Sequence, residues 1–200
     1  MQDSIPFREI SLVALVASGL IVALAIGSYS PTDVAFSYTS TQAISENLIG
    51  NAGAVFAGVV LWSFGWVAWV LPMMLAIIGW RLVKHREETA TWQVTLIRTL
   101  GWIGVVIGLC VLMDLHFTGD GTLPAGPGGM IGASFGSVGT SLMGWIGLTL
   151  LMISLVLIGA QAAAGFSWAA VAERVGHLLE VVGAGLQNLW IRLRRDGAAP

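Results

Sequence analysis

Apolar residues in this chain gather into long runs that charged residues rarely interrupt. Four runs reach the length of about 20 apolar residues that a helix needs to cross the hydrocarbon core of a bilayer. The predicted spans are residues 10–28, 57–80, 94–115 and 139–165. The pattern therefore predicts an all-α integral membrane protein with four transmembrane helices.

The segments between the spans differ in character. The first outer segment, 29–56, contains Ser40 and Thr41 followed by a stretch to Asn51 that fits a short periplasmic helix leading into the second span. The second outer segment, 116–138, is rich in Gly and Pro and is expected to turn at the membrane surface. The remaining predicted segments are the N-terminus 1–9, the basic loop 81–93, a helix over 166–195 and the start of a linker at 196–200.

Basic residues mark one side of the membrane. Segments 29–56 and 114–138 contain no Lys or Arg, whereas Arg81, Lys84 and Arg86 lie between the second and third spans. Arg98 stands at the start of the third span, where its side chain can reach the headgroups. The bias of Lys and Arg toward cytoplasmic loops then predicts a multi-pass protein with both termini in the cytoplasm.

Residues 166–195 predict an amphipathic helix rather than a fifth span. Apolar residues recur every three or four positions from Trp168 to Leu193, and polar residues such as Glu173 and Glu180 occupy the other side. The basic end of this helix fits a position on the inner leaflet, and the helix equally fits a stalk toward a further domain.

The composition supports the membrane assignment. Charged residues make up 10% of the chain. A soluble domain usually has about 25% charged residues. The 26 glycines and 9 tryptophans suit close helix packing and interfacial anchoring. The leading segment lacks the positive charge of a signal peptide, so the first run is expected to remain as a span.

Small residues recur at helical spacing in two spans. Gly104 and Gly108 form a GxxxG motif, and the small residues Gly132, Gly136, Thr140 and Gly144 recur at every fourth position. Such faces allow close contact between helices. Packing inside one four-helix bundle is the favoured interpretation, and self-association between copies is the alternative.

The sequence carries no recognisable catalytic or cofactor site. Lys84 is the only lysine and has no glycine-rich lead, which excludes a Walker A phosphate loop. The three His residues and Cys110 form no metal-binding pair, so we expect no metal and no cofactor. No basic tract predicts nucleic-acid contact. Asp114 and His116 motivate a transporter or channel subunit as the alternative function, although an interfacial polar cluster explains them better.

Several motifs in order resemble the N-terminal four-helix membrane domain of FtsK-type bacterial cell-division DNA translocases. They are Ser28-Tyr-Ser-Pro-Thr-Asp33, Asn51-x-Gly53, Phe64-Gly65, Pro72, Gly79-Trp-Arg-Leu82, Arg98-x-x-Gly101 and Leu123-Pro-Ala-Gly-Pro-Gly-Gly-Met-Ile-Gly132. The resemblance covers residues 7–168. Candidates for shaping the periplasmic loops or contacting partners are Pro31, Asp33, Asn51, Gly53, Gly128, Gly129 and Gly132. Candidates for helix packing are Gly104, Gly108, Gly136 and Gly144.

The resemblance implies an inner-membrane anchor at the division septum, with divisome membrane proteins as partners and a hexameric cytoplasmic motor beyond the C-terminal helix. The motor and its ATPase activity have no counterpart among these residues. Both a fragment of a longer protein and a short paralogue fit the sequence.

Overall fold

A computed structural model of the chain describes residues 7–33, 45–84, 91–119, 121–177, 179–180 and 183. All the regular structure in this described part is helical. It contains α1 (Phe7–Gly27), α2 (Gly50–Phe64), a 3-10 helix η1 (Gly65–Trp69), α3 (Val70–Lys84), α4 (Trp92–His116) and α5 (Gly129–Ala164). Four helical stretches are long and apolar enough to cross a membrane, namely 10–27, 50–81, 92–116 and 129–164.

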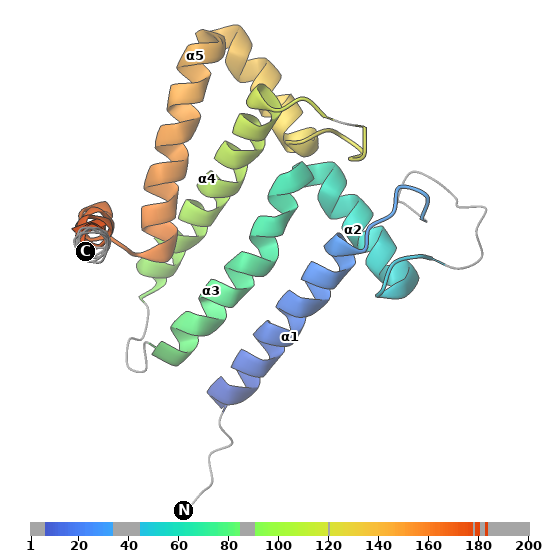
Figure 1. The fold of residues 1–200 in the computed structure, drawn as a ribbon, viewed down its shortest axis with the longest axis horizontal. Helices are drawn as coiled ribbons and strands as arrows, with labels where there is room; N and C mark the ends of the chain where they lie inside the picture. The colour runs from blue at the N-terminus through green and yellow to red at the C-terminus, as the bar shows by residue number, and fades with distance from the viewer. Residues whose placement is uncertain are drawn as a thin grey trace, which may run out of the picture. The chain divides into compact units, whose positions relative to one another are not determined.

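The first half of the chain is built on a hairpin of α1 and α3. The two helices run side by side in Figure 1, and Gly19 and Gly79 allow the approach. A Cβ atom at Gly19 would lie 3.8 Å from Leu75 of α3, and one at Gly79 would lie 3.5 Å from Leu12 of α1. Near the end of α1, Ile26 packs with Val60, Leu61 and Ala68 in a small apolar core.

The second predicted span is interrupted at Gly65. This residue has a φ of 58° and a ψ of −136° and separates α2 from η1 and α3. Such a backbone conformation is essentially restricted to glycine. Figure 1 shows α2 turning away from α3 at this point, across the end of the α1–α3 hairpin. The predicted span 57–80 therefore straddles a bend, and the straight part that pairs with α1 is α3. Of the helix expected before Asn51, residues 45–49 are not helical, and the part before residue 45 lies outside the described residues.

The second half repeats this plan. Helix α4 packs along the second part of α5, residues 145–164, and Gly144 breaks α5 with a φ of 71° and a ψ of 170°. The first part of α5, residues 129–143, turns away across the end of the hairpin as α2 does (Figure 1). The helix begins at Gly129, ahead of the predicted start at 139, so residues 129–138 are helical where a loop was expected. The Pro-containing stretch ends at Pro127, which leaves the following residues free to form a helix.

The two halves are also related in sequence. Gly50 and Gly129 are 79 positions apart, as are Gly65 and Gly144, and the segments between them align without a gap. Both segments fit the pattern G-x-x-G-A-x-F-x-x-V followed by five residues and Gly-Trp. Both begin with the same turn, in which Gly50 donates to Asn47 O at 2.8 Å and Gly129 donates to Gly126 O at 3.2 Å. Shared sequence, bend and turn together identify an internal repeat.

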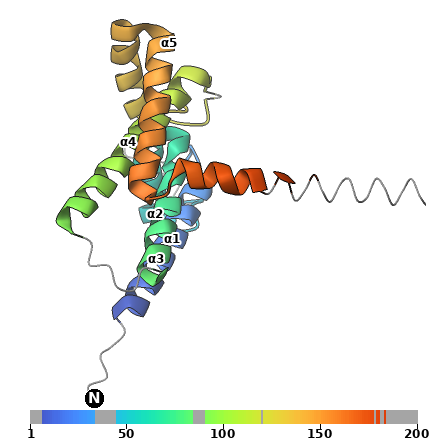
Figure 2. The same cartoon turned by 90° about the vertical axis from the view of Figure 1, so that its left-hand side faces the viewer.

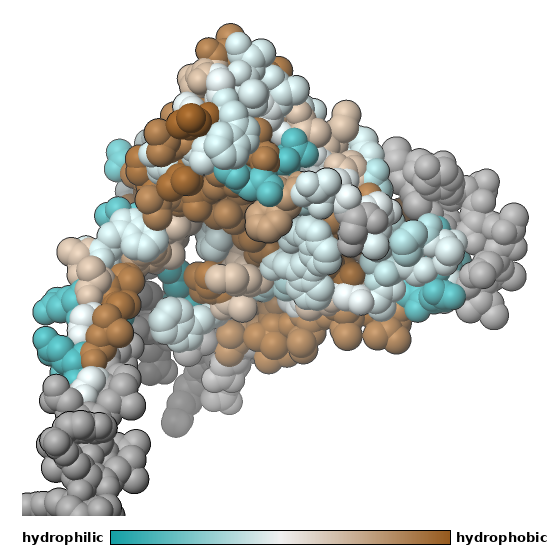
Figure 3. Space-filling view, turned by 45° about the horizontal axis from the view of Figure 1, so that its top comes forward, coloured by the Kyte–Doolittle hydropathy of each residue, from teal (hydrophilic) through white to brown (hydrophobic). Residues whose placement is uncertain are grey.

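Apolar side chains cover the outside of this helical unit as well as its interior. Large exposed residues occur along every described helix of the unit, among them Val13, Trp62, Met73, Ile103 and Ile158. Brown, hydrophobic residues occupy much of the face in Figure 3, with hydrophilic residues in small patches. Such a surface suits contact with lipid.

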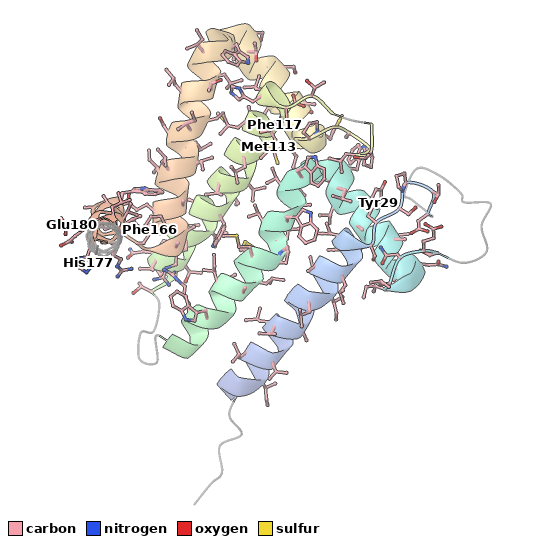
Figure 4. All side chains as sticks on the ribbon, in the orientation of Figure 1. Tyr29, Met113, Phe117, Phe166, His177 and Glu180 are labelled. Carbon is pink, nitrogen blue, oxygen red and sulfur yellow. The ribbon has the colours of Figure 1, made fainter. Side chains whose placement is uncertain are left out.

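Residues from Ala164 onward form a separate unit. Residues 168–177 are helical, and this helix shows teal residues along one side and brown along the other at the left edge of Figure 3. Phe166 and Trp168 stack edge to face with their ring centroids 4.7 Å apart. His177 lies 4.0 Å from the carboxylate of Glu180 (Figure 4). Figure 2 shows helices α1 to α5 from a second direction.

Candidate functional site

Asn47 joins the end of α1 to the start of α2. Its side-chain amide donates to Ala25 O at 2.8 Å and to Ser28 O at 3.3 Å. These carbonyls lie at the end of α1, where backbone acceptors lack helical partners. The Oδ1 atom of Asn47 accepts from the backbone N–H of Ile49 at 3.0 Å and so shapes the turn before α2. The side chain is only 4% exposed, and Gly53 packs directly on it. One buried amide therefore fixes where α2 begins relative to α1.

Asp33 closes the segment that precedes this turn. Its Oδ1 atom accepts from the backbone N–H of Glu46 at 2.7 Å, and the side chain is buried. Pro31 and Asn51 are exposed near the same end of the unit. The structure therefore brings Asp33 and Gly53 into the packing around the turn, and it leaves Pro31 and Asn51 at the surface.

Replacing Asn47 tests this connection. Asn47→Ala is expected to lower the free energy of unfolding by about 2 kcal/mol, because the buried carbonyl of Ala25 and the part-buried carbonyl of Ser28 lose their donor. Asn51→Ala is the matched control, since Asn51 is exposed, and we expect a change within about 0.5 kcal/mol. Unfolding of the purified chain in mixed micelles, followed by Trp fluorescence, measures both; equal losses would contradict the role of Asn47.

The two repeats meet at the bend of the first repeat. The backbone N–H of Trp66, just after the bend, donates to Pro127 O at 2.8 Å. Gly129 lies against Ser63, Phe64 and Gly65; a Cβ atom there would be 2.5 Å from Ser63 O and 2.6 Å from the amide nitrogen of Gly65. Cys110 of α4 is fully buried beside the same bend, with its Sγ atom 3.6 Å from Phe64 O. We call this contact the inter-repeat junction.

Leu123 extends the inter-repeat junction toward the apolar core. It precedes α5 in the chain, yet it packs on the core cluster of Ile26, Val60, Leu61 and Ala68 in the first repeat. Tyr29, which follows α1, packs on the same cluster (Figure 4). The segment before α5 therefore covers the first repeat with both backbone and side-chain contacts.

An open groove of about 540 Å³ lies between α4 and the first part of α5. Its lining combines the half-buried carboxyl group of Asp114 with the hydroxyl-bearing residues Ser137, Thr140 and Ser141. Thr140 donates to Gly136 O at 2.6 Å and Ser141 to Val138 O at 2.7 Å, so these hydroxyls already bond to their own helix. The groove offers polar contacts at the end of the unit.

His116 lies beside this groove but binds to the second part of α5. Its Nε2 atom is 3.2 Å from the hydroxyl of Thr149, and its ring meets that of Trp145 edge to face with centroids 4.8 Å apart. Trp145 also donates through Nε1 to Leu115 O at 3.4 Å. Met113 and Phe117 are near neighbours at this end of α4 (Figure 4). These contacts hold the end of α4 against α5 and give His116 a structural role.

Glycines bring α4 and α5 into close contact. A Cβ atom at Gly101 would lie 2.7 Å from Ala163 N, one at Gly104 would lie 3.2 Å from Leu155, and one at Gly108 would lie 2.6 Å from Val156.

Gly128 and Gly132 both pack on Cys110 O and Asp114, and Gly136 lies near the carboxyl group of Asp114. Gly144 differs from its predicted role in packing, because it forms the bend of α5 and a Cβ atom there would meet nothing within 4 Å.

Positive charge lies at the other end of the unit. Arg81, near the end of α3, donates through Nη1 to Ala163 O at 3.3 Å. A cation at this position complements the C-terminal end of a helix. Arg98 is half-buried in the first turns of α4. Among the described side chains, Asp33, Glu46 and Asp114 all lie toward the end where α2 and the first part of α5 cross, so the charges are separated along the unit.

Among the described residues, no group of three His, Cys, Asp or Glu side chains is placed to hold a metal ion. The polar groups that the structure brings together are used in helix caps and turns. These described contacts pack the helices and shape the turns between them.

Comparison with protein families gives a direct match. The model for the 4TM region of DNA translocase FtsK/SpoIIIE matches residues 6–176. The chain belongs to this FtsK/SpoIIIE 4TM family. It is 30% identical over 189 residues to DNA translocase FtsK of Pseudomonas putida, and 30% identical over 175 residues to the same protein of Pseudomonas aeruginosa.

The match to these FtsK proteins is confined to one part of them. It covers 92% of this chain and 23% of the Pseudomonas putida protein, and 86% and 22% in the Pseudomonas aeruginosa comparison. The chain therefore spans about a quarter of the length of these relatives. No solved structure matches the chain.

Within this FtsK-type unit, sequence reasoning missed the residues that matter most for the junction. Asn47, Pro127 and Leu123 were not singled out individually, and Gly65 was noted only as part of a motif. The recurrence of Gly-Trp at 65–66 and 144–145 was the available signal, since it marks the two bends.

Proposed function

We propose that this chain is the inner-membrane anchor of a DNA translocase that couples chromosome segregation to cell division, and that it also contacts other divisome membrane proteins. The match to the 4TM region of FtsK/SpoIIIE over residues 6–176 carries this proposal. The translocase activity itself would belong to a motor region, since the matched region is the 4TM part alone. This chain is proposed to need no cofactor and to make no nucleic-acid contact.

In this proposal both termini lie in the cytoplasm. Arg81 and Arg98 lie at the end of the unit where α3 finishes and α4 starts, which supports placing that end inside. The helix over 168–177 would then be an amphipathic cytoplasmic helix, on the membrane or in a stalk. The end that carries the inter-repeat junction and the open groove would face the periplasm, where α2 takes the part of the short periplasmic helix.

Cysteine labelling tests this orientation with a matched pair of exposed threonines, one beyond each end of α4. Thr118→Cys is expected to react with a membrane-impermeant maleimide in spheroplasts, whereas Thr91→Cys should react only after the membrane is permeabilised. Cys110 remains as a buried background thiol in both variants. Labelling of Thr91→Cys in intact spheroplasts would reverse the proposed orientation.

Localisation tests the role in division. The chain fused to a fluorescent protein and produced at native level is expected to collect at midcell during constriction. Fluorescence spread evenly over the membrane in dividing cells would refute the septal role while leaving the membrane anchor intact.

A transporter or channel subunit has less support. The sequence has no Asp, Glu, Lys, Arg or His between residues 10 and 32, 47 and 80, 99 and 113, or 121 and 172. Transport sites usually need such groups, or broken helices, near the middle of the bilayer. Both bends in this chain lie instead at the end where α2 and the first part of α5 cross.

A further inference from the structure

The inter-repeat junction joins two different surfaces, and each surface has an equivalent that the described part of the chain leaves uncovered. Inside the chain, the turn Gly126–Gly129 of the second repeat meets the bend at Gly65 of the first. The internal repeat supplies a second turn, Asn47–Gly50, and a second bend, at Gly144. A Cβ atom at Gly65 or Gly129 would collide with the opposite repeat, whereas one at Gly50 or Gly144 would meet nothing within 4 Å.

Exposure shows the same difference at equivalent positions. Pro127, which accepts the bond from Trp66, is buried, whereas its equivalent Leu48 is 72% exposed. Val67, just after the first bend, is 4% exposed, whereas its equivalent Ile146 is 68% exposed. The turn of the first repeat and the bend of the second repeat are therefore uncovered, whereas the equivalent turn of the second repeat and bend of the first are covered.

The groove beside Asp114 follows this rule. Its lining residues Ala133, Gly136 and Thr140 correspond to Ala54, Ala57 and Leu61 of the first repeat. Those three equivalents are all buried, and Leu61 belongs to the core cluster on which Leu123 packs. The groove is open in the second repeat because no third repeat follows in the described part of the chain to cover it.

We propose the contact through which copies of this chain meet in the membrane: the turn Asn47–Gly50 of one copy docks on the bend at Gly144 of the next, head to tail. The contact would reproduce between copies the inter-repeat junction found inside each copy. Inside the chain, the turn Gly126–Gly129 covers the bend at Gly65. The one described equivalent of that turn is Asn47–Gly50, so the occupant of the bend at Gly144 is this turn of a second copy.

The arrangement is compatible with a single membrane. Helices α1 and α4 run in the same direction, as do α3 and the second part of α5, so the repeats are parallel (Figure 1). The same step from repeat to repeat then places the next copy in the same orientation across the bilayer. The interface joins two different surfaces, so the copies form a ring where the rotation closes and a row where it does not. This inference stands on the repeat geometry and does not depend on the proposed function.

Cysteine cross-linking of the full chain in native membranes tests the proposal. Leu48→Cys and Met143→Cys are produced on separately tagged chains in one cell and oxidised with copper phenanthroline. Both side chains are exposed, so the substitutions should not disturb folding. The expected product is a dimer that carries both tags, and a chain with both substitutions should give a ladder of larger multimers. A second pair combines Leu48→Cys with Leu142→Cys, at the position equivalent to Ser63.

The controls separate this interface from chance collision. Val13→Cys with Ile158→Cys, two exposed residues outside the contact, should give no mixed product above that of the unchanged chain with Cys110 alone. Phe64→Cys with Pro127→Cys should cross-link within one chain and report that the internal junction is intact. Dimers formed by Leu48→Cys alone would show a two-fold interface and overturn the proposal. Absence of mixed product from both pairs would show that lipid covers these surfaces and would also overturn it.

Discussion

Gly65→Ala is expected to destabilise the unit far more than Gly144→Ala. Both glycines have positive φ and nearly extended ψ. An added methyl group therefore costs about 1–3 kcal/mol of backbone strain at either position. At Gly65 the methyl group would also meet the backbone of Pro127 and would lie 2.6 Å from Gly126 O. Backbone displaced in a packed site adds about 1–3 kcal/mol.

The difference between the two variants measures the inter-repeat junction. Unfolding in mixed micelles, at a protein concentration that keeps the chain monomeric, gives the two free energies. Amide hydrogen exchange at Trp66 gives a second measure, because loss of its bond to Pro127 O should speed exchange in Gly65→Ala alone. Equal destabilisation by both substitutions would show that strain explains the effect and that the junction contributes little.

Gly101→Leu is the second substitution with a large expected effect. A side chain at Gly101 would meet backbone atoms of α5, with its Cβ atom 2.7 Å from Ala163 N and 2.8 Å from Gly159 O. Backbone cannot rotate aside as a side chain can, so α4 and α5 would separate at this end. We expect a loss of about 3 kcal/mol, at the upper end of the usual cost of overpacking.

Gly104→Ala is the matched control on the same face of α4. Its added methyl group would lie 3.2 Å from a terminal carbon of Leu155, which can change rotamer. Alanine also favours the helix over glycine by about 1 kcal/mol, so little net change is expected. Unfolding of the two variants under one condition checks the pair. A large loss from Gly104→Ala would mean that Leu155 cannot move.

The four helical stretches were predictable because apolar length alone identifies them. The apolar run from Asn47 to Trp80 was nevertheless interpreted as containing one span, since hydropathy does not report where a backbone bends. In the sequence, Gly65 and Gly144 look like the packing glycines Gly104 and Gly108. Only the backbone dihedral angles distinguish the two kinds, since φ is positive at Gly65 and Gly144. The helices that contain the second and fourth predicted spans start at Gly50 and Gly129, ahead of the predicted starts at 57 and 139.

The candidate site was predictable in its location more than in its residues. The motifs around Asp33, Gly53 and Gly128 lie at the end of the unit that contains the turns and the inter-repeat junction. Asn47 was overlooked because a single asparagine in a loop has no periodic pattern, and its importance depends on the carbonyls of Ala25 and Ser28, far from it along the chain. Long-range packing of Leu123 on the first repeat is likewise absent from local sequence.

The hydrogen bond between Asp33 and Glu46 holds together the two ends of the segment that joins them. Chain that leaves at Asp33 returns at Glu46, thirteen positions later, to an atom 2.7 Å away. Loop-closure entropy rises by only about 0.6 kcal/mol for each doubling of length. An insertion between these two positions is therefore expected to cost little stability, because the hydrogen bond between Asp33 and Glu46 keeps the two chain ends together whatever length of chain joins them.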